Sequence, residues 1–131
     1  MKSLISGIHH IALSCGGMDK FNETIFFYQN TLGLTLVRRW GEGLDAAAML
    51  STGDGILEIF AGGELLPQGT IQHFALRTSD PDACITAVRN AGYAITIEPK
   101  DIEIASKPPF PARIAFCKGP IGEVIEFFHE R

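Results

Sequence analysis

The sequence predicts an α+β fold built from two copies of a βαβββ module, and three observations lead to this prediction. The frame Ile-x-His-x-Ala-Leu occurs at residues 8–13 and returns at residues 71–76. About 50 residues after each copy, a glutamate lies within an apolar run, Glu58 in the first half and Glu126 in the second. In both halves the hydrophobic pattern changes from that of a strand to that of a helix and then to that of three strands.

The first module is expected to occupy residues 1–66. Residues 8–15 are rich in β-branched and apolar side chains and run into a pair of glycines, which is typical of a strand before a turn. Between residues 19 and 32 apolar side chains recur at helical spacing, and Gly33 stands where a helix C-cap belongs. Glycine-containing turns then separate three further apolar segments, expected to be strands, at residues 34–40, 44–51 and 55–61.

The second module is expected to occupy residues 67–131 and to pack with the first into one compact domain, because the connection at residues 62–69 is short. A strand is predicted over residues 71–78. The stretch Ser79-Asp80-Pro81-Asp82 then offers an N-cap, an early proline and acidic residues, and the helix is expected to run to Gly92. Three more strands are expected near residues 94–98, 113–118 and 122–128.

Residues 99–112 are expected to form a long loop. Pro108, Pro109 and Pro111 argue against regular structure in this stretch. A loop of this length beside a binding cleft is often a lid or a specificity loop, and a plain surface loop is the alternative.

Composition and charge narrow the class of partner. The chain of 131 residues carries a formal net charge of −4, and its basic side chains form no cluster longer than Arg38-Arg39. Nucleic acids and anionic membranes both require a positive patch, so a small molecule is the expected partner. Three cysteines without a CxxC pair favour packing roles in a reducing cytosol. No run approaches the ~18 apolar residues of a membrane span, so we expect a soluble, unprocessed cytoplasmic protein.

Strand alternation places the two repeated histidines on equivalent faces. Successive side chains of a strand point to opposite faces, so His10 points away from the face that holds Ile11 and Leu13. The more apolar face is expected to meet the helix, which leaves His10 on the open face. The same alternation puts His73 on the open face of the second module. His9 is expected to point away from this face and to have a structural role.

Glu58 and Glu126 fall on the open face as well, because the apolar neighbours of each glutamate are expected to face the helix. A carboxylate in a mostly apolar strand costs several kcal/mol unless it is solvated, paired or bound to a cation. Two neutral imidazoles and two carboxylates neutralise a 2+ ion and suit Ni, Zn, Fe, Mn or Co. The sequence therefore predicts a divalent metal held by His10, Glu58, His73 and Glu126. For any one of these residues taken singly, a packed histidine or a salt-bridged glutamate is the alternative.

Five motifs carry a resemblance to a known family: HHIAL around His10, FYQNTLGL from Phe27 to Leu34, LEIF around Glu58, QHFAL around His73, and GPIGEVIEFF from Gly119 to Phe128. With them the chain resembles the vicinal oxygen chelate superfamily, which includes glyoxalase I, methylmalonyl-CoA epimerase, fosfomycin-resistance transferases, extradiol dioxygenases and bleomycin-binding proteins. The resemblance covers nearly the whole chain. It implies two βαβββ modules in an open, barrel-like mixed sheet with helices outside, and a homodimer.

Glyoxalase I is the most similar member in its ligand set, which is also His, Glu, His and Glu. The resemblance implies a metal-dependent lyase or isomerase that acts on a small vicinal-oxygen substrate through an enediolate, with Glu126 or Glu58 moving the proton. One divalent ion per site is implied, either within one chain or shared between two. Two alternatives stay open: another metal-dependent member (an epimerase, a dioxygenase or a thiol transferase), and a non-catalytic protein that binds a small molecule or drug.

Three positions differ from glyoxalase I and bear on the substrate. Ser14 replaces its glutathione-binding arginine, Gly62 replaces its asparagine, and Gly69 replaces an arginine of some members. These differences argue against glutathione recognition and favour another small oxygenated molecule. The candidate anion contacts, with solvated surface charges as the alternative, are Arg38, Arg77, Lys107 and Arg113. The aromatic residues that could line a pocket, with core packing as the alternative, are Trp40, Phe60, Phe110 and Phe128.

Overall fold

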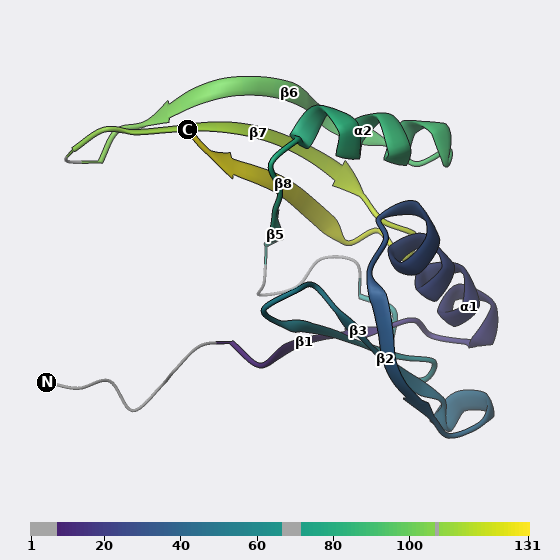
Figure 1. Cartoon of the computed structure of the whole chain (residues 1–131). Helices are drawn as coiled ribbons and strands as arrows, with labels where there is room; N and C mark the ends of the chain where they lie inside the picture. The colour runs from purple at the N-terminus through teal and green to yellow at the C-terminus, as the bar shows by residue number, and fades with distance from the viewer. Residues whose placement is uncertain (1–7, 67–71, 107) are drawn as a thin grey trace, which may run out of the picture. The chain divides into compact units, whose positions relative to one another are not determined.

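The computed structural model describes residues 8–66, 72–106 and 108–131 and contains, in these ranges, eight strands, two α-helices and two short helical turns (Figure 1). The chain divides into two compact units. One comprises Met1–Gln29 and Gly33–Leu65, and the other comprises Asn30–Leu32 and Leu66–Arg131. None of the helices in the described ranges is long and apolar enough to cross a membrane.

The first half of the chain folds as a strand, a helix and three strands. The helix begins at Met18, remains α-helical to Phe26 and ends in a π-helical turn, after which Gly33 has a φ of 79°. This positive φ confirms the predicted glycine cap. The elements are β1 (His10–Ser14), α1 (Met18–Phe26), the π turn (Phe27–Thr31), β2 (Thr35–Trp40), a 3₁₀ turn (Gly43–Asp45), β3 (Ala47–Ser51) and β4 (Ile56–Phe60).

The second half repeats this order. Its helix starts where the sequence predicts, because the Asp80 Oδ1 atom accepts a hydrogen bond from the Ala83 backbone N–H at 3.0 Å and Pro81 occupies the first turn. The predicted strand at residues 71–78 is shorter in the structure, and its first residue lies outside the described residues. The elements are β5 (Phe74–Arg77), α2 (Pro81–Asn90), β6 (Ile95–Ile104), β7 (Phe110–Lys118) and β8 (Val124–Glu130).

The described strands form two four-stranded mixed sheets and no closed barrel. Their orders are β1-β4-β3-β2 and β5-β8-β7-β6. In each sheet the first and last strands of the module pair in parallel, and the remaining pairs are antiparallel. The predicted α+β class and the repeated βαβββ order are therefore confirmed.

Each sheet has one face covered by the helix of its own unit. In the first unit α1 contacts β4, and the buried side chains include Phe21 and Ile25 from the helix. In the second unit α2 contacts β6, β7 and β8, and it buries Ile85 and Val88. This arrangement leaves the opposite face of each sheet to carry polar groups.

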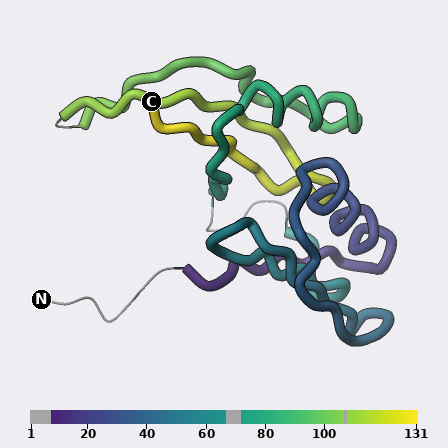
Figure 2. The backbone as a smooth tube through the Cα atoms, in the orientation of Figure 1, coloured from purple at the N-terminus to yellow at the C-terminus, as the bar shows by residue number. Residues whose placement is uncertain are grey.

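The prediction of a loop over residues 99–112 is wrong. This stretch belongs to a long hairpin in which β6 and β7 run side by side, as the backbone trace shows (Figure 2). Pro99 lies in β6, an edge strand, and the pairing register shifts between Ile97 and Lys100. Proline is tolerated at such irregular edge positions because its missing N–H breaks no regular ladder bond there. Pro111, opposite Glu103, lies near the start of β7.

The turn after β2 requires glycine at Gly41, which supports a stability prediction. Gly41 has a φ of 75°, and a Cβ atom built there would overlap the backbone oxygen of Asp45. Gly43 is the matched control, because its φ is 56° but a Cβ there meets nothing within 4 Å. We expect Gly41→Ala to lower the free energy of unfolding by about 2–3 kcal/mol and Gly43→Ala by about 1 kcal/mol in urea titrations. Equal losses would contradict the steric part of this explanation.

Candidate metal site

The first unit brings His10 and Glu58 together. β1 runs parallel to β4 with His10 in register with Ile56, so the His10 side chain lies diagonally from Glu58 on the neighbouring strand. The His10 Nε2 atom lies 3.5 Å from the Glu58 Oε1 atom. Ala12 is in register with Glu58, and its small side chain leaves room beside the carboxylate. The side chain of His10 is 40% exposed, and that of Glu58 is 12% exposed.

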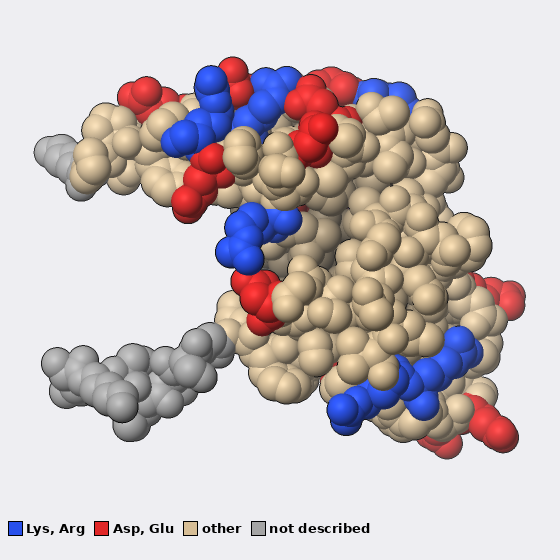
Figure 3. All heavy atoms as spheres, viewed as in Figure 1, with Lys and Arg blue, Asp and Glu red and all other residues tan. Residues whose placement is uncertain are grey.

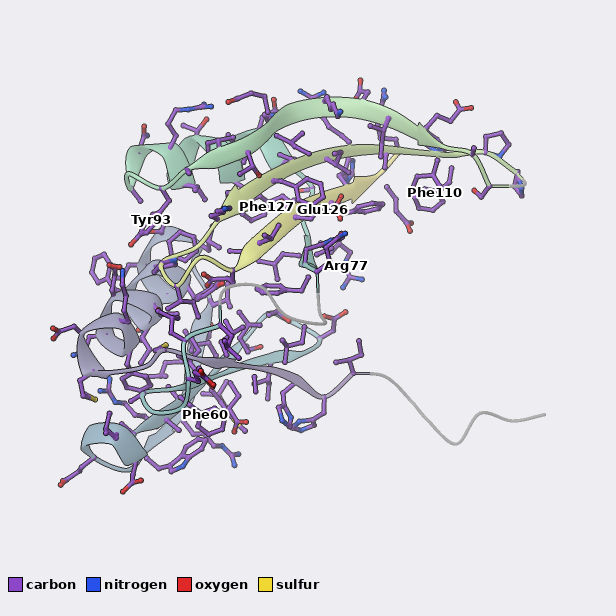
Figure 4. All side chains as sticks on the ribbon, turned by 180° about the vertical axis from the view of Figure 1, so that it is seen from behind. Phe60, Arg77, Tyr93, Phe110, Glu126 and Phe127 are labelled. Carbon is purple, nitrogen blue, oxygen red and sulfur yellow. The ribbon has the colours of Figure 1, made fainter. Side chains whose placement is uncertain are left out.

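The second unit repeats this pair with His73 and Glu126. His73 directly precedes β5, in which Ala75 is in register with Glu126 of β8. The His73 Nε2 atom lies 3.3 Å from the Glu126 Oε1 atom, and the two side chains are 31% and 12% exposed. Glu126 is labelled on β8 in Figure 4. Each unit therefore carries one imidazole and one largely buried carboxylate at equivalent strand positions.

The alternation predicted for the glutamate strands is confirmed by burial. Leu57 and Ile59 on either side of Glu58 are at most 1% exposed, as are Ile125 and Phe127 on either side of Glu126. These four apolar side chains pack into the cores that the helices cover. The glutamates consequently point to the opposite face of each sheet.

Burial changes the acidity of Glu126. Loss of hydration raises the pKa of its carboxyl, because a low-dielectric environment disfavours the charged form. The charge of His73 and its hydrogen bond to the carboxylate act in the opposite direction and lower the pKa, but they do not cancel the burial effect. Glu126 therefore holds a proton more readily than an exposed glutamate does.

The structure adds two residues to the site that the sequence argument did not place there. His9 Nδ1 lies 3.0 Å from His10 Nδ1, and the two rings meet edge to face at a centroid distance of 5.2 Å. His73 Nδ1 lies 2.8 Å from the Gln72 Oε1 atom. The expectation that His9 points away from the face of the site stays a prediction, since His9 contacts His10 at Nδ1 and the ring nitrogen nearest Glu58 is Nε2. The sequence did contain a sign of these two contacts, because the polar residues His9 and Gln72 occupy the same place in the two repeats, 63 residues apart.

An aromatic side chain contacts the histidine of the pair in the second unit, and two further aromatic side chains of this unit contact each other. Phe116 is in register with Glu126 and meets the His73 ring edge to face at a centroid distance of 5.3 Å. Phe110 and Phe128, two of the predicted pocket residues, have ring centroids 6.0 Å apart. In the first unit Met49 takes the place of Phe116 in register with Glu58. The other two predicted pocket residues, both in the first unit, are exposed Trp40 and half-buried Phe60.

The four candidate anion contacts have different surroundings. Arg113 is held by Asp82, with its Nε and Nη2 atoms 2.6 and 2.8 Å from the two carboxylate oxygens, and by Asp101 at 3.1 Å. Figure 3 shows acidic and basic side chains interleaved over α2 and β6 of this unit. The Arg113 guanidinium lowers the pKa of Asp82 through these hydrogen bonds. Lys107 lies outside the described residues, and Arg38 and Arg77 are exposed on β2 and β5.

The donor groups of each pair suit one metal ion. Two ligands of a tetrahedral ion, each bound at ~2.0–2.1 Å, lie roughly 3.3–3.4 Å apart, which is close to the separations of 3.5 and 3.3 Å in the two pairs. Within the ranges that the structure describes, no three or more His, Cys, Asp or Glu side chains cluster in a way that could hold a metal ion. Each pair contains two of the four residues that the sequence predicts as ligands.

A family model described as Glyoxalase/Bleomycin resistance protein/Dioxygenase superfamily matches residues 7–127. The chain belongs to this superfamily. No curated protein matched the sequence. Superfamily members include enzymes as well as non-catalytic binding proteins, so membership does not choose the reaction.

Several solved structures have the same fold as this chain. TnmS3, described as an antibiotic binding protein from Streptomyces sp. CB03234, is 21% identical, with a TM-score of 0.75 over 99% of this chain and 100% of that one. A glyoxalase/bleomycin resistance protein/dioxygenase from Alicyclobacillus acidocaldarius is 17% identical, with a TM-score of 0.68 over 95% and 91% of the two chains. A glyoxalase family protein from Enterococcus faecalis is 18% identical, with a TM-score of 0.72 over 96% and 99%.

Gly62, one of the positions that differ from glyoxalase I, has a structural reason to be glycine. A Cβ atom at this position would lie 2.6 Å from the backbone oxygen of Leu44. Such a contact is too short for any side chain, so an asparagine would require the turn before β3 to move. Glycine at position 62 therefore allows the chain to pass close to the backbone of Leu44.

Proposed function

We propose that the protein is a metal-dependent enzyme of glyoxalase type, a lyase or isomerase that acts on a small vicinal-oxygen substrate. The observation that carries this proposal is the repetition of the His–Glu pair, with Nε2–Oε1 distances of 3.5 Å and 3.3 Å. One such pair is an ordinary ion pair. Two at equivalent strand positions, each on the face away from the helix, support a common ligand.

In this proposal His10, Glu58, His73 and Glu126 hold one divalent ion, either within one chain or shared across a homodimer in the cytoplasm. The neutral imidazoles and the two carboxylates balance the charge of Ni²⁺, Zn²⁺, Fe²⁺, Mn²⁺ or Co²⁺. A divalent ion bound there would stabilise the negative charge that develops on a substrate oxygen when a neighbouring proton is removed. The two sheets would then supply ligands in equal number.

Glu126 is the group that we assign to proton transfer. Its Oε1 or Oε2 atom accepts the proton from the carbon beside the substrate carbonyl and returns it to the adjacent carbon. Burial raises the pKa of Glu126, which makes this carboxylate a stronger base than an exposed glutamate. Glu58, its counterpart in the first unit, would serve as a ligand and is the alternative base.

The substrate that we expect is not a glutathione conjugate. Ser14 and Gly62 stand where glyoxalase I has glutathione contacts, and Gly62 has no room for a side chain in this backbone. Arg38 and Arg77 are candidate contacts for an anionic group. Arg38 of β2 is in register with Met49 of β3, and Met49 is in register with Glu58 of β4. Arg77 of β5 is in register with Phe128 of β8.

A non-catalytic binder of a small molecule is the second candidate. It is favoured by the aromatic side chains near Glu126, since Phe116 contacts His73 and Phe110 lies beside Phe128. Flat apolar surfaces of this kind suit a planar ligand. The fold similarity to an antibiotic binding protein is in keeping with this candidate.

Metal analysis of the purified protein separates the two candidates. The metal-dependent enzyme is expected to hold about one divalent ion per site after reconstitution, and His10→Ala and Glu126→Gln are expected to hold much less. Glu130→Gln is the matched control, because Glu130 is exposed near the end of the same strand as Glu126. A wild-type protein that takes up no ion on reconstitution would rule out the metal-dependent proposal. Ligand binding by that metal-free protein would then support the second candidate.

A further inference from the structure

The turn that joins β7 to β8 contains a buried carboxylate that the proposed mechanism does not use (Figure 1). Glu123 directly precedes β8 and is 5% exposed. Its Oε1 atom accepts a hydrogen bond from the Ile121 backbone N–H at 3.1 Å, and its backbone oxygen accepts one from the Gly119 N–H at 2.9 Å. The Gly122 N–H donates to the Gly119 oxygen at 3.0 Å within the same turn. Glu123 therefore closes this turn with both its backbone and its side chain.

Gly119 leaves the space that the Glu123 side chain occupies. A Cβ atom built at Gly119 would overlap the carboxylate group of Glu123. Gly119 does not have a positive φ, so the carboxylate, and not the backbone conformation, is what excludes a side chain there. A buried carboxylate is unfavourable unless it is hydrogen-bonded, and an apolar side chain would fill the same space at lower cost. The presence of Glu123 in this turn therefore indicates a role in shaping it.

The register of β8 decides to which face Glu126 points. Successive side chains of a strand alternate, so a shift by one residue would move Glu126 to the face that α2 covers. In the structure Glu126 is in register with Phe116 of β7. The apolar pattern of β8 specifies this register only weakly, because buried Phe127 and half-buried Phe128 are adjacent and identical. Turn geometry is the other determinant of register in a hairpin, so it carries more weight here.

The first unit closes its equivalent turn, between β3 and β4, in a different way. There the Gly53 backbone N–H donates to the Ser51 Oγ atom at 3.1 Å. Residues 52–54 are all at least partly exposed, so this turn contains no buried carboxylate. The buried carboxylate belongs to the unit that carries Glu126, to which we assign proton transfer.

We propose that Glu123 is a positioning residue, whose carboxylate closes the β7–β8 turn and so holds β8 in the register that places Glu126 beside His73. The purpose of this contact rests on the proposed function, because it concerns Glu126 as a ligand and a base. The turn itself belongs to the chain without metal. Its role can therefore be tested separately from metal binding and from turnover.

The first test is a double-variant cycle in metal-free protein, followed by NMR. Glu123→Ala should weaken the cross-strand nuclear Overhauser effects between Phe116 and Glu126 and speed amide hydrogen exchange in β8 by about 10-fold. Gly119→Ala should have a similar effect, because its methyl group displaces the carboxylate. In the double variant this overlap is absent, so exchange should be little faster than in Glu123→Ala. Glu123→Gln keeps an oxygen for the Ile121 N–H and should resemble wild type.

The second test is zinc affinity, measured by competition with a chromophoric chelator. Glu123→Ala is expected to weaken zinc binding about 10-fold, and Glu123→Gln should retain the wild-type affinity. Val88→Ala is the control for a loss of stability alone, because Val88 is fully buried in α2 of the same unit and lies outside the turn. It should lower the urea midpoint without weakening zinc binding. Glu123→Asp, whose carboxylate is one methylene shorter, replaces Glu123→Ala if that variant does not fold.

The outcomes distinguish this inference from the proposed function. If Glu123→Ala lowers the urea midpoint but changes neither the cross-strand contacts nor zinc affinity, the positioning role is overturned while the metal site stands. Equal weakening of zinc binding by Val88→Ala would also overturn it. If wild type takes up no zinc, the proposed function fails, and the cycle in metal-free protein decides the role of Glu123. Non-additive effects of Glu123→Ala and Gly119→Ala then support that role, and additive effects contradict it.

Discussion

Replacing Glu126 by glutamine should lower kcat of the metal-loaded protein by about 10²- to 10⁴-fold, the range that a general base contributes. Glutamine keeps the size of the side chain and an oxygen atom, but it cannot accept the proton that leaves the substrate carbon. The measurement is deuterium uptake from solvent at that carbon, followed by NMR. The probes are hemithioacetals of methylglyoxal, one formed with glutathione and one with a small thiol.

Glu58→Gln is the matched variant for this experiment, because Glu58 occupies the equivalent position in the other unit and is equally exposed, at 12% of its side chain. We expect Glu58→Gln to weaken metal binding but to retain more of the exchange rate than Glu126→Gln at saturating metal. Equal losses would mean that both carboxylates share the proton transfer. Absence of exchange by metal-loaded wild type with both probes would contradict the lyase or isomerase proposal and favour the small-molecule binder.

Local patterns in the sequence were sufficient to predict the helices and the repeat. They were not sufficient to predict which strands pair. The apolar spacing of α1 and the Asp80 cap depend on residues a turn apart, and both appear in the structure at the expected positions. The β6–β7 hairpin depends on pairing between residues such as Glu103 and Pro111. Prolines argue against a strand when its place in the sheet is unknown, but an edge strand with register shifts accommodates Pro99. Which strand forms the edge is a property of the whole sheet.

At the candidate site, too, local patterns predicted some features and did not determine others. The repeated frame and strand alternation brought His10 to Glu58 and His73 to Glu126, because alternation within a strand follows directly from sequence spacing. His9 lies one residue before β1, which begins at His10, so strand alternation alone does not determine the direction of its side chain.

The residues around the His–Glu pairs were harder to predict from the sequence than the pairs themselves. Phe116 reaches His73 because β7 and β8 pair with Phe116 in register with Glu126, a relation between distant segments. Arg113 was a candidate anion contact until its pairing with Asp82 and Asp101 placed it in an ion-pair network. A charge on a strand cannot be assigned to a site before the residues facing it are known.

Substitution of a single histidine should weaken metal binding by all four ligands together if both His–Glu pairs hold the same ion. Structural zinc sites with four ligands bind with about 10–16 kcal/mol, so the loss of one ligand should cost roughly 3–4 kcal/mol, or about 10²- to 10³-fold in affinity. We therefore expect His10→Ala and His73→Ala each to bind zinc about 10²- to 10³-fold more weakly than wild type, although each leaves the other pair unchanged. Isothermal titration of the metal-free variants measures both the stoichiometry and the affinity.

The double variant His10→Ala/His73→Ala completes the argument, because contacts to a shared ion are not independent. If one ion bridges the pairs, the first substitution removes most of the binding and the second adds little. If each pair binds its own ion, each single variant should instead keep half of the wild-type stoichiometry at wild-type affinity. Mixing His10→Ala with His73→Ala protein then locates the shared site. Recovery of tight zinc binding in the mixture requires ligands from two chains, since a site built within one chain would lack a histidine in both proteins.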